Sequence, residues 1–332
     1  MLNIIDHIPV QLLGLQATDL HKVLPGPTLV HLQGKRKRPM FISVLVHGNE
    51  HTGWEAVRQL LADFHSRELP RSISLFIGNV EAARYNKRFL QGQPDYNRIW
   101  DGGPSPEHKM MQLVIEELEK REVLLSIDIH NNTGKNPHYA CVNRTYNRFI
   151  QLATLFSSIV VYFIRPAGVQ SMAFSRICPA VTIECGKSGE PEGIDHVYQY
   201  LHTCLNMEEL PDHAVDHSTY DLFHTIAVVK IPEDVTFGFQ TGQVDLELYD
   251  FLERYNFNEL PANTEIGRIH SDVKQPFFIR DEQGNEIYHQ YFHVESGKIL
   301  TRQGLIPSMI TLDTDIIRKD CFFYVMEHCV KG

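Results

Sequence analysis

Runs of apolar residues without polar alternation recur through the first two thirds of the chain. Such runs, rich in β-branched residues, are typical of strands buried on both faces of an α/β sheet. They occupy residues 28–34, 38–46, 72–80, 123–129, 159–164 and 180–185. Between them, apolar side chains at helical spacing predict helices over 52–65, 106–121 and 146–158. Alternating strands and helices indicate an α/β fold whose mixed, mostly parallel sheet carries helices on both faces.

Turn signals complete this pattern. The basic stretch KRKR (35–38) separates the first two predicted strands, so we expect a solvated hairpin turn there. Residues 81–103 are polar and predict a long loop. Pro106 and Glu107 favour the start of the second helix.

The character of the chain changes near residues 210–221. Beyond them come short strands with turn residues between them, interrupted by one predicted helix over 245–255. We therefore predict two domains, a larger α/β domain over 1–212 and a smaller β-rich domain over 213–332.

Composition narrows the class of protein. The 332 residues include 31 basic and 41 acidic ones, a formal net charge of −10, which argues against a nucleic-acid or acidic-membrane binder. The N-terminus shows no signal-peptide pattern, and no apolar run approaches the ~20 residues of a membrane helix. Six scattered cysteines without CxxC pairs fit reduced thiols and a cytoplasmic protein. A homo-oligomer stays an open alternative to a monomer.

Two of the apolar runs end on histidine. FISVLV leads into His47 and Glu50 of HGNEH, and the 123–129 run leads into His130. Ligands of α/β sheets gather at the carboxyl ends of such strands. Two imidazoles and one carboxylate leave zinc with an open fourth position, as catalytic sites require, so we expect one Zn²⁺ per chain.

HGNEH also matches a different zinc motif. Read as H-x-x-E-H, it would bind zinc through His47 and His51, with Glu50 as the base. That reading needs a helix, whereas Gly48 and Asn49 are poor helix formers that follow a strand. The H-x-x-E reading with a distant third ligand fits better. Asp128 shares a strand face with His130 and is a candidate to orient it.

Two further features point to hydrolysis of an anionic substrate. Glu184 lies near the end of the apolar run AVTIEC, an unusual place for a carboxylate without a function. Arg84, Lys87, Arg88 and Arg98 give residues 84–98 a basic character in an acidic protein. A local positive field and arginine forks suit a carboxylate-bearing ligand.

The ordered motifs resemble the succinylglutamate desuccinylase/aspartoacylase family, which has a zinc carboxypeptidase-like fold. The resemblance covers roughly residues 40 to 190, and no motif after 213 matches, although family members carry a small C-terminal β domain there. The motifs are HGNE at 47–50, Asn79 and Ala82 with Arg88 and Phe89, Asp95 with Asn97 and Arg98, Asp128 with His130–Thr133, and Ile183, Glu184 and Gly186.

The resemblance implies roles for individual residues. His47, Glu50 and His130 would bind zinc. Glu184 would be the general base that activates water and then protonates the leaving amine. Arg88 would stabilise the oxyanion, with Arg84 as the alternative because the following FLQGQP spacer is longer than the family's. Carboxylate binding would fall to Asn97 and Arg98, with Arg176 as a further contact.

The leading functional hypothesis is a zinc-dependent amidohydrolase that removes the acyl group from a small anionic N-acyl amino acid. The alternative enzyme is a zinc carboxypeptidase that acts on a small peptide or peptidoglycan fragment, since the metal site and the Asn-Arg pair would be the same. A zinc protein without catalysis is the third hypothesis. It is disfavoured because a structural zinc site closes its fourth position with another protein ligand.

Overall fold

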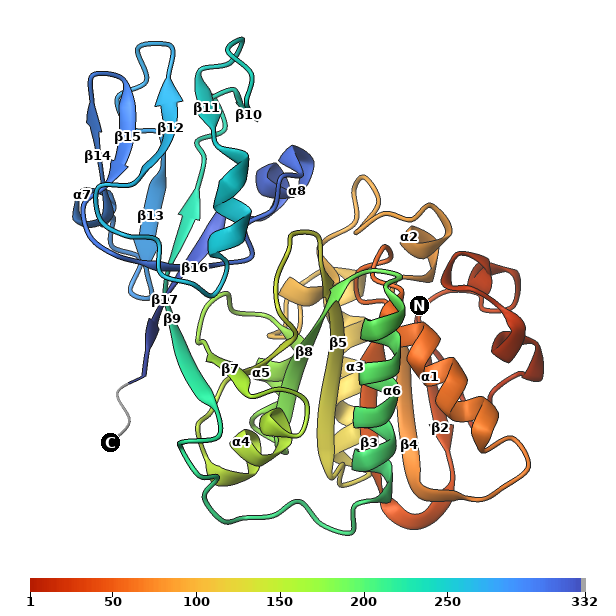
Figure 1. Ribbon diagram of the computed structural model, residues 1–332. Helices are drawn as coiled ribbons and strands as arrows, with labels where there is room; N and C mark the ends of the chain where they lie inside the picture. Colours follow the sequence, from red (N-terminus) through yellow and green to blue (C-terminus); the bar gives the residue numbers. More distant parts are fainter. Residues whose placement is uncertain (330–332) are drawn as a thin grey trace. The chain divides into compact units, whose positions relative to one another are not determined.

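A computed structural model describes residues 1–329 of the chain. The chain divides into two compact units. The first comprises residues 1–131 and 138–221, and the second comprises residues 132–137 together with the chain from Leu222 onward. The two units are described in turn below (Figure 1).

The first unit is built on a mixed sheet with the strand order β1-β2-β4-β3-β5-β8-β6-β7. β3 runs parallel to both β4 and β5, and β6 runs parallel to β7, whereas β2 is antiparallel to β4 and β6 to β8. The strands at the centre of this sheet are buried over their apolar runs, as those runs predict. The strands are β1 (Asn3–Ile5), β2 (Thr28–Leu32), β3 (Gly34–Val44), β4 (Leu69–Ile77), β5 (Leu125–Asn132), β6 (Tyr139–Val142), β7 (Ile159–Tyr162) and β8 (Ala180–Lys187).

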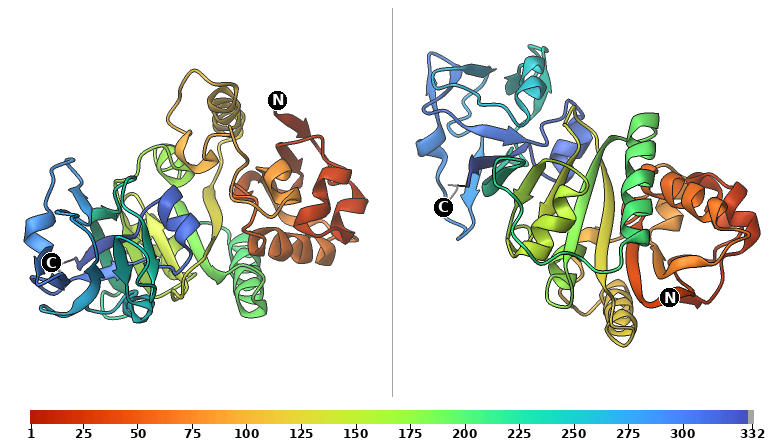
Figure 2. Two further views of the ribbon diagram at one scale, coloured as in Figure 1. Left: turned by 90° about the horizontal axis from the view of Figure 1, so that it is seen from above. Right: turned by 60° about the horizontal axis from the view of Figure 1, so that its bottom comes forward.

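Helices cover both faces of this sheet. α1 and α6 lie side by side on one face, and α3 lies on the opposite face (Figure 2). α1 presents Trp54, Val57, Leu60 and Leu61 to the core, at the spacing that predicts it. The helices are α1 (Thr52–Asp63), α2 (Val80–Arg84), α3 (Pro106–Glu119), α4 (Asn147–Thr154), α5 (Gln170–Phe174) and α6 (Pro191–Asn206), with 3-10 turns η1 (Val10–Gly14), η2 (Ala17–Lys22) and η3 (Tyr96–Arg98).

The predicted hairpin at residues 35–38 is wrong. These residues belong to β3, which begins at Gly34, and β2 pairs with β4 instead of with β3. The pairing register of β3 with β4 shifts between Arg36 and Met40. The basic residues thus lie where the regular pairing of the two strands is interrupted. The connection between β2 and β3 is therefore a sharp change of strand position, not a turn between neighbours.

The second unit packs two groups of strands around one apolar core. In one, β9 pairs with β13 and β17, and β17 pairs with β16; the other has the order β10-β11-β12-β15-β14. The segment 132–137 joins this unit because Asn256 donates to the carbonyl of Lys135 and Asn136 accepts from the amide of Met309. The elements are β9 (Asp221–Lys230), β10 (Phe237–Phe239), β11 (Leu246–Leu248), η4 (Asp250–Tyr255), β12 (Glu265–Ile269), β13 (Phe278–Asp281), α7 (Tyr288–Tyr291), β14 (Phe292–Glu295), β15 (Lys298–Thr301), β16 (Ile306–Ser308), α8 (Thr314–Lys319) and β17 (Phe323–His328).

The helix predicted over 245–255 is also wrong. Its first part forms β11, whose Leu246 and Leu248 are buried against β12, and only residues 250–255 are helical, as the 3-10 turn η4. The short apolar segment LEL suits both a strand and a helix, and pairing in the sheet decides between them. Among residues 1–329, no helix is long and apolar enough to span a bilayer, and all six cysteines are free thiols.

Candidate metal centre and active site

The candidate site lies where β3 and β5 end in the first unit. The two parallel strands pair in register, with Ser43 opposite Asp128. β3 ends at Val44, and the loop that leads to α1 carries His47 and Glu50. His130 was expected just beyond its strand, but β5 extends to Asn132 and so includes it.

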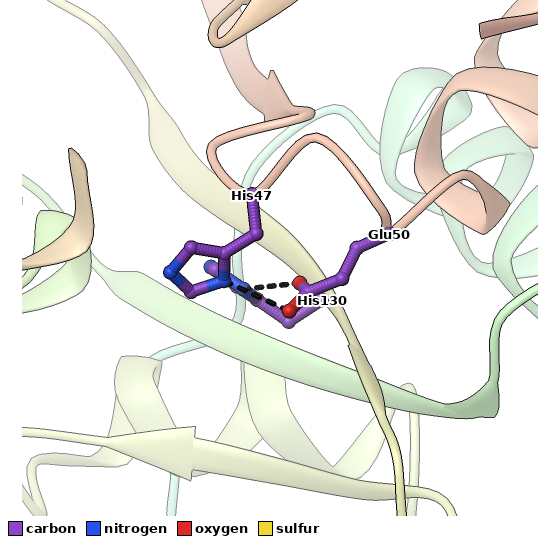
Figure 3. A group of neighbouring side chains, drawn as sticks. All are labelled: His47, Glu50 and His130. Atoms are coloured by element: carbon purple, nitrogen blue, oxygen red, sulfur yellow. Dashed lines mark hydrogen bonds and ion pairs between the residues drawn. The ribbon is translucent and has the colours of Figure 1, made fainter. Parts of the chain in front are cut away.

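Three side chains converge there (Figure 3). The Nδ1 atoms of His47 and His130 lie 2.8 and 2.7 Å from the two carboxylate oxygens of Glu50. Ligand atoms of all three residues lie within 4.8 Å of one another, and all three side chains are buried. The arrangement brings together two nitrogen donors and one oxygen donor, the donor set predicted from the sequence.

The far nitrogen of each imidazole meets a second carboxylate. His47 Nε2 lies 2.9 Å from Asp95 Oδ1, and His130 Nε2 lies 2.8 Å from Asp128 Oδ2. Ser43 donates to the other oxygen of Asp128 over 2.5 Å and fixes that carboxylate in the sheet. Carboxylates placed in this way hold an imidazole with Nδ1 facing a metal and raise its basicity.

The electrostatics of the cluster favour a cation. Burial disfavours charge on His130, but Asp128 and Glu50 outweigh it and raise the pKa of this imidazole well above its usual value. For His47, burial and Arg88 are likewise outweighed by Glu50 and Asp95, so its pKa is raised. Burial alone would raise the pKa of the Glu50 carboxyl, but the two histidines hold it well below its usual range. The three carboxylates thus create a negative potential at the imidazoles.

A tightly packed loop holds His47 and Glu50. Gly48 lies against α2, where a Cβ would overlap the backbone of Ala82 and Ala83, and its amide donates to the carbonyl of Arg88 over 3.0 Å. Glu50 accepts a hydrogen bond of 3.2 Å from the amide of Asn131. Glycine is therefore required at 48 by close backbone approach, and the loop is tied to both neighbouring segments.

Arg88, in the basic loop, reaches the cluster with its guanidinium group. Its guanidinium lies 3.0 Å from Asp95 Oδ2 through Nη2 and 3.9 Å from Glu50 Oε1 through Nη1. The alternative, Arg84, is exposed and its guanidinium stacks on Tyr85. The long spacer does not displace Arg88 because Gln93 folds it back, accepting from Asn79 and from the amide of Leu90.

Asn97 and Arg98 follow Asp95 in η3. Asn97 is buried, with Nδ2 3.2 Å from His130 Nε2, and its Oδ1 accepts from the amide of Gln170. Arg98 is half-buried and donates to the carbonyl of Asn97 over 2.8 Å. Both residues therefore lie beside the cluster, within the same loop as Arg88.

Glu184 lies inside β8, the strand next to β5. The side chain is buried, and burial raises the pKa of its carboxyl to about 7, partly offset by the charge on His130. A carboxyl group with this pKa can hold or release a proton near neutral pH, as a general acid and base must. The charges of His47, Glu50 and Asp128 also act on it, so the structure brings Glu184 to the same cluster.

Arg176 and His51 are not brought to the cluster. Arg176 is exposed and lines a cavity together with Cys178 and Pro179, which precede β8 and so lie at the strand end remote from Glu184. His51 immediately precedes α1, and its Nε2 lies 3.0 Å from the carbonyl oxygen of Gly48. This placement favours the H-x-x-E reading of HGNEH over the H-x-x-E-H reading.

Sequence reasoning missed two members of the site. The sequence shows Asp95 only as part of a motif, yet in the structure it joins His47 to Arg88. Ser43 belongs to an apolar run that predicts only a strand, yet its hydroxyl donates to Asp128. A serine inside the apolar run FISVLV, one residue before the end of β3, is the available signal for Ser43, whereas the partner of Asp95 depends on how a long loop folds.

The donor set fits a divalent transition-metal ion. Zinc binds imidazole nitrogen and carboxylate oxygen, and three protein ligands are the usual number at catalytic zinc. The opposing carboxylates on the remote nitrogens are the usual second layer of such sites. The residues therefore can hold a metal ion beside a buried carboxyl group of pKa about 7.

Solved structures share this fold. The chain is similar to the succinylglutamate desuccinylase of Chromobacterium violaceum, with 17% identity over 89% of this chain and 86% of that one and a TM-score of 0.56. It is likewise similar to a succinylglutamate desuccinylase/aspartoacylase of Rhodobacter sphaeroides, with 13% identity over 91% and 89% and a TM-score of 0.58. Murine aminoacylase 3 matches with 13% identity over 90% and 97% and a TM-score of 0.58.

At these identities the solved structures establish the fold alone. A comparison with curated proteins finds no match. The family model of the succinylglutamate desuccinylase/aspartoacylase catalytic domain matches residues 37–209, which is more than half of the chain and includes every member of the cluster. The chain therefore belongs to the succinylglutamate desuccinylase/aspartoacylase family of deacylases.

Proposed function

We propose that this protein is a zinc-dependent deacylase that hydrolyses the amide bond of a small anionic N-acyl amino acid. The observation that carries the proposal is the buried cluster of His47, Glu50 and His130 beside Glu184. Membership of a deacylase family supports the reaction class. The basic loop that contains Arg88 and Arg98 supports an anionic substrate.

In this proposal His47, Glu50 and His130 hold one Zn²⁺ per chain. When bound, the ion supplies Lewis acidity, which polarises a carbonyl group and makes water more acidic. Asp128 and Asp95 keep the two imidazoles oriented with Nδ1 toward Glu50. The protein groups then have to move one proton, stabilise one developing charge and hold the substrate.

Glu184 moves the proton. As the carboxylate it accepts a proton from the attacking water, and as the carboxylic acid it passes that proton to the amine nitrogen that leaves. Both forms are accessible because burial raises the pKa of Glu184 to about 7. The positive charge of a bound metal ion lowers the pKa of Glu184. The pKa that governs the acid limb of the pH–rate profile should therefore lie below about 7.

Arg88 stabilises the charge that develops on the carbonyl oxygen. Its guanidinium lies within 3.9 Å of Glu50 and is oriented by Asp95, so its position is set before substrate binds. A preoriented donor of this kind lowers the barrier because it needs no reorganisation during the reaction. Asn97 and Arg98 extend the polar surface along the same loop and hold the substrate carboxylate.

A hydrolysis screen with a single substitution tests the proposal. The zinc-loaded protein should release the amine from at least one N-acetyl, N-succinyl or N-formyl amino acid in the panel. Glu184→Gln should lower kcat by about 10²- to 10⁴-fold while the protein retains near wild-type bound zinc. Glu192→Gln, at an exposed glutamate in the first turn of α6, is the matched control and should stay near wild type.

The same panel should contain dipeptides. Hydrolysis of dipeptides in preference to every acyl amino acid would contradict the proposed substrate class and favour the carboxypeptidase alternative. Wild-type turnover by Glu184→Gln would contradict the proposed mechanism whichever substrate is used.

A further inference from the structure

The first unit contains a cavity that is remote from the metal centre. It has a volume of about 510 Å³ and is lined by the start of α4 and by the segment between α5 and β8. We call it the arginine cavity because Arg144, Arg148 and Arg176 line it. Pro179 marks its position just before β8, and five residues of extended strand, about 16 Å, separate Pro179 from Glu184. The cavity is therefore not part of the proposed active site.

Positive charge is in excess in the arginine cavity. Within the described residues 1–329, Asp212 is the one acidic residue that lines it, and this carboxylate lies 3.3 Å from Arg148 Nε. Among residues 1–329, neither Arg144 nor Arg176 has a carboxylate partner. Two uncompensated guanidinium groups converge on one cavity in a protein whose formal net charge is −10. Such a local reversal attracts an anionic ligand.

Helix α4 adds to this positive character. Its N-cap residue, Tyr146, makes no side-chain hydrogen bond to the first turn, and Arg148 and Phe149 of that turn line the cavity. Unsatisfied amides at a helix start carry partial positive charge and bind phosphate groups. The helix start and the arginines thus present the same sign of charge to one space.

The remaining wall is apolar and aromatic. Phe149, Ile177 and Pro179 line the cavity, and the ring of Tyr146, 65% exposed, lies edge-on to Phe149 with 6.3 Å between centroids. The guanidinium of Arg144 lies over the Tyr146 ring at 5.9 Å. An exposed aromatic ring next to a cation offers a surface on which a flat ring of a ligand can stack.

The cavity is built for binding and not for a second reaction. Burial raises the pKa of the Cys178 thiol well above its usual range, so this thiol stays protonated and unreactive. The Ser175 hydroxyl donates to the carbonyl of Met172, and no histidine lines the cavity in the described part of the chain. None of its lining groups is activated for attack on a bound molecule.

We propose that the arginine cavity binds a small molecule that carries both a phosphate monoester and a flat ring, as a nucleoside monophosphate does. A phosphate monoester carries a charge of about −1.5 to −2 at neutral pH, which matches the two uncompensated arginines. Guanidinium forks bind phosphate oxygens in pairs. The volume lies within the range of about 300–1,000 Å³ typical of small-molecule sites. This proposal does not depend on the proposed deacylase activity.

Calorimetric titration of the zinc-loaded protein with adenosine monophosphate tests the site. We expect binding, and we expect Arg176→Gln and Arg144→Gln each to raise Kd about tenfold or more. The double variant should bind no measurable ligand. Arg280→Gln removes an exposed arginine of the second unit and is the matched control with unchanged Kd. Because Arg144 and Arg176 make no ion pairs with the residues that the structure describes, thermal melting should show that the variants remain folded.

Three further measurements separate the sources of binding. Hydrogen exchange should slow over residues 144–150 and 175–179 when adenosine monophosphate is present. The Glu50→Gln variant should bind it as the wild type does, because the metal centre is not involved. Inorganic phosphate and adenosine should each bind more weakly than the intact nucleotide.

The proposal has clear contrary outcomes. Equal or tighter binding of succinate would show that the cavity prefers a dicarboxylate, and would overturn the assignment to phosphate. Binding that survives in the double variant, or exchange protection confined to residues 47–50 and 130, would overturn the assignment to this cavity. Either result would leave the proposed deacylase function untouched, since that rests on turnover and bound zinc.

Discussion

The two imidazoles of the candidate site are held by carboxylates on both sides. Asp95 meets His47 and Asp128 meets His130, while Glu50 lies between the two rings. Asp128 is fully buried and would be costly to bury without the hydrogen bonds from Ser43 and His130. Its retention in the core is therefore explained by the imidazole that it orients and not by packing.

This leads to a prediction for Asp128→Asn. The amide keeps the shape of the side chain but loses the charge that makes His130 a basic ligand, so Kd for zinc should rise about 10- to 100-fold. Ser43→Ala should weaken zinc binding in the same direction by a smaller factor. Competition with a chromophoric chelator measures zinc binding by both variants. The control is Ser74→Ala, which changes a buried serine of β4 that is hydrogen-bonded to His31 of β2. Unchanged zinc affinity in Asp128→Asn would show that the carboxylate has no part in metal binding.

At the scale of single residues, the sequence predicts those positions that strand periodicity and motif spacing determine. His47, Glu50 and His130 follow apolar runs, and they do meet. The position of Asp128 beside His130 follows from the alternation of side chains in a strand, which puts residues two apart on the same face. The family resemblance implies that Arg176 contacts the substrate, whereas the structure places it just before β8, at the strand end remote from Glu184. Spacing along the chain cannot specify which end of a sheet a loop residue reaches.

Among the elements, the loop between β3 and α1 is the one that sets the geometry of the metal centre. It holds two of the three candidate ligands, and it packs against α2 so closely that residue 48 has no room for a side chain. Leu45 adopts a left-handed conformation with φ of 54° as the chain leaves β3. Its carbonyl accepts from the amide of Asn79, which joins this loop to the one after β4.

Gly48→Ala should therefore damage stability and metal binding together. Its methyl group would overlap the backbone of Ala82 and Ala83, and overpacking of this kind costs about 1–3 kcal/mol of unfolding free energy. Urea denaturation and zinc titration measure the two effects. Gly14→Ala, where no atom lies within 4 Å of an added Cβ, is the matched control and should show neither. If Gly48→Ala lost no stability, the close packing of the loop against α2 would be wrong.

Element by element, the long apolar patterns were interpreted correctly and the ambiguous ones were not. The predicted strands and helices at the centre of the first unit are present because each buries a continuous apolar face. The strand order explains the failed hairpin, since β4 enters between β2 and β3 although it follows them in the chain. Helix α6 was missed, even though Pro191 and Glu192 open it as Pro106 and Glu107 open α3.

On the scale of the whole molecule, charge is distributed unevenly. The chain carries a formal net charge of −10, yet the basic loop of the proposed active site and the arginine cavity are both positive. The candidate metal-binding cluster has the opposite sign of charge, because carboxylates surround its two imidazoles. An anionic substrate and a metal cation would therefore be attracted to neighbouring but oppositely charged groups, which keeps the two binding events chemically distinct.

Metal uptake by the whole protein should be coupled to proton release. Carboxylates raise the pKa of both His47 and His130, so these rings keep their protons to a higher pH than free imidazoles do, and a metal ion must displace those protons. Raised pKa values mean that zinc affinity falls as the pH falls, by up to about tenfold per pH unit for each proton released. Calorimetry in buffers of different ionisation enthalpy counts the protons directly. The zinc-loaded protein should also melt at a higher temperature than the metal-free protein, by a margin that shrinks toward acid pH. A zinc Kd that stays constant between about pH 6 and about pH 8, with no proton released, would mean that the imidazoles are already neutral and that the carboxylates do not control the site.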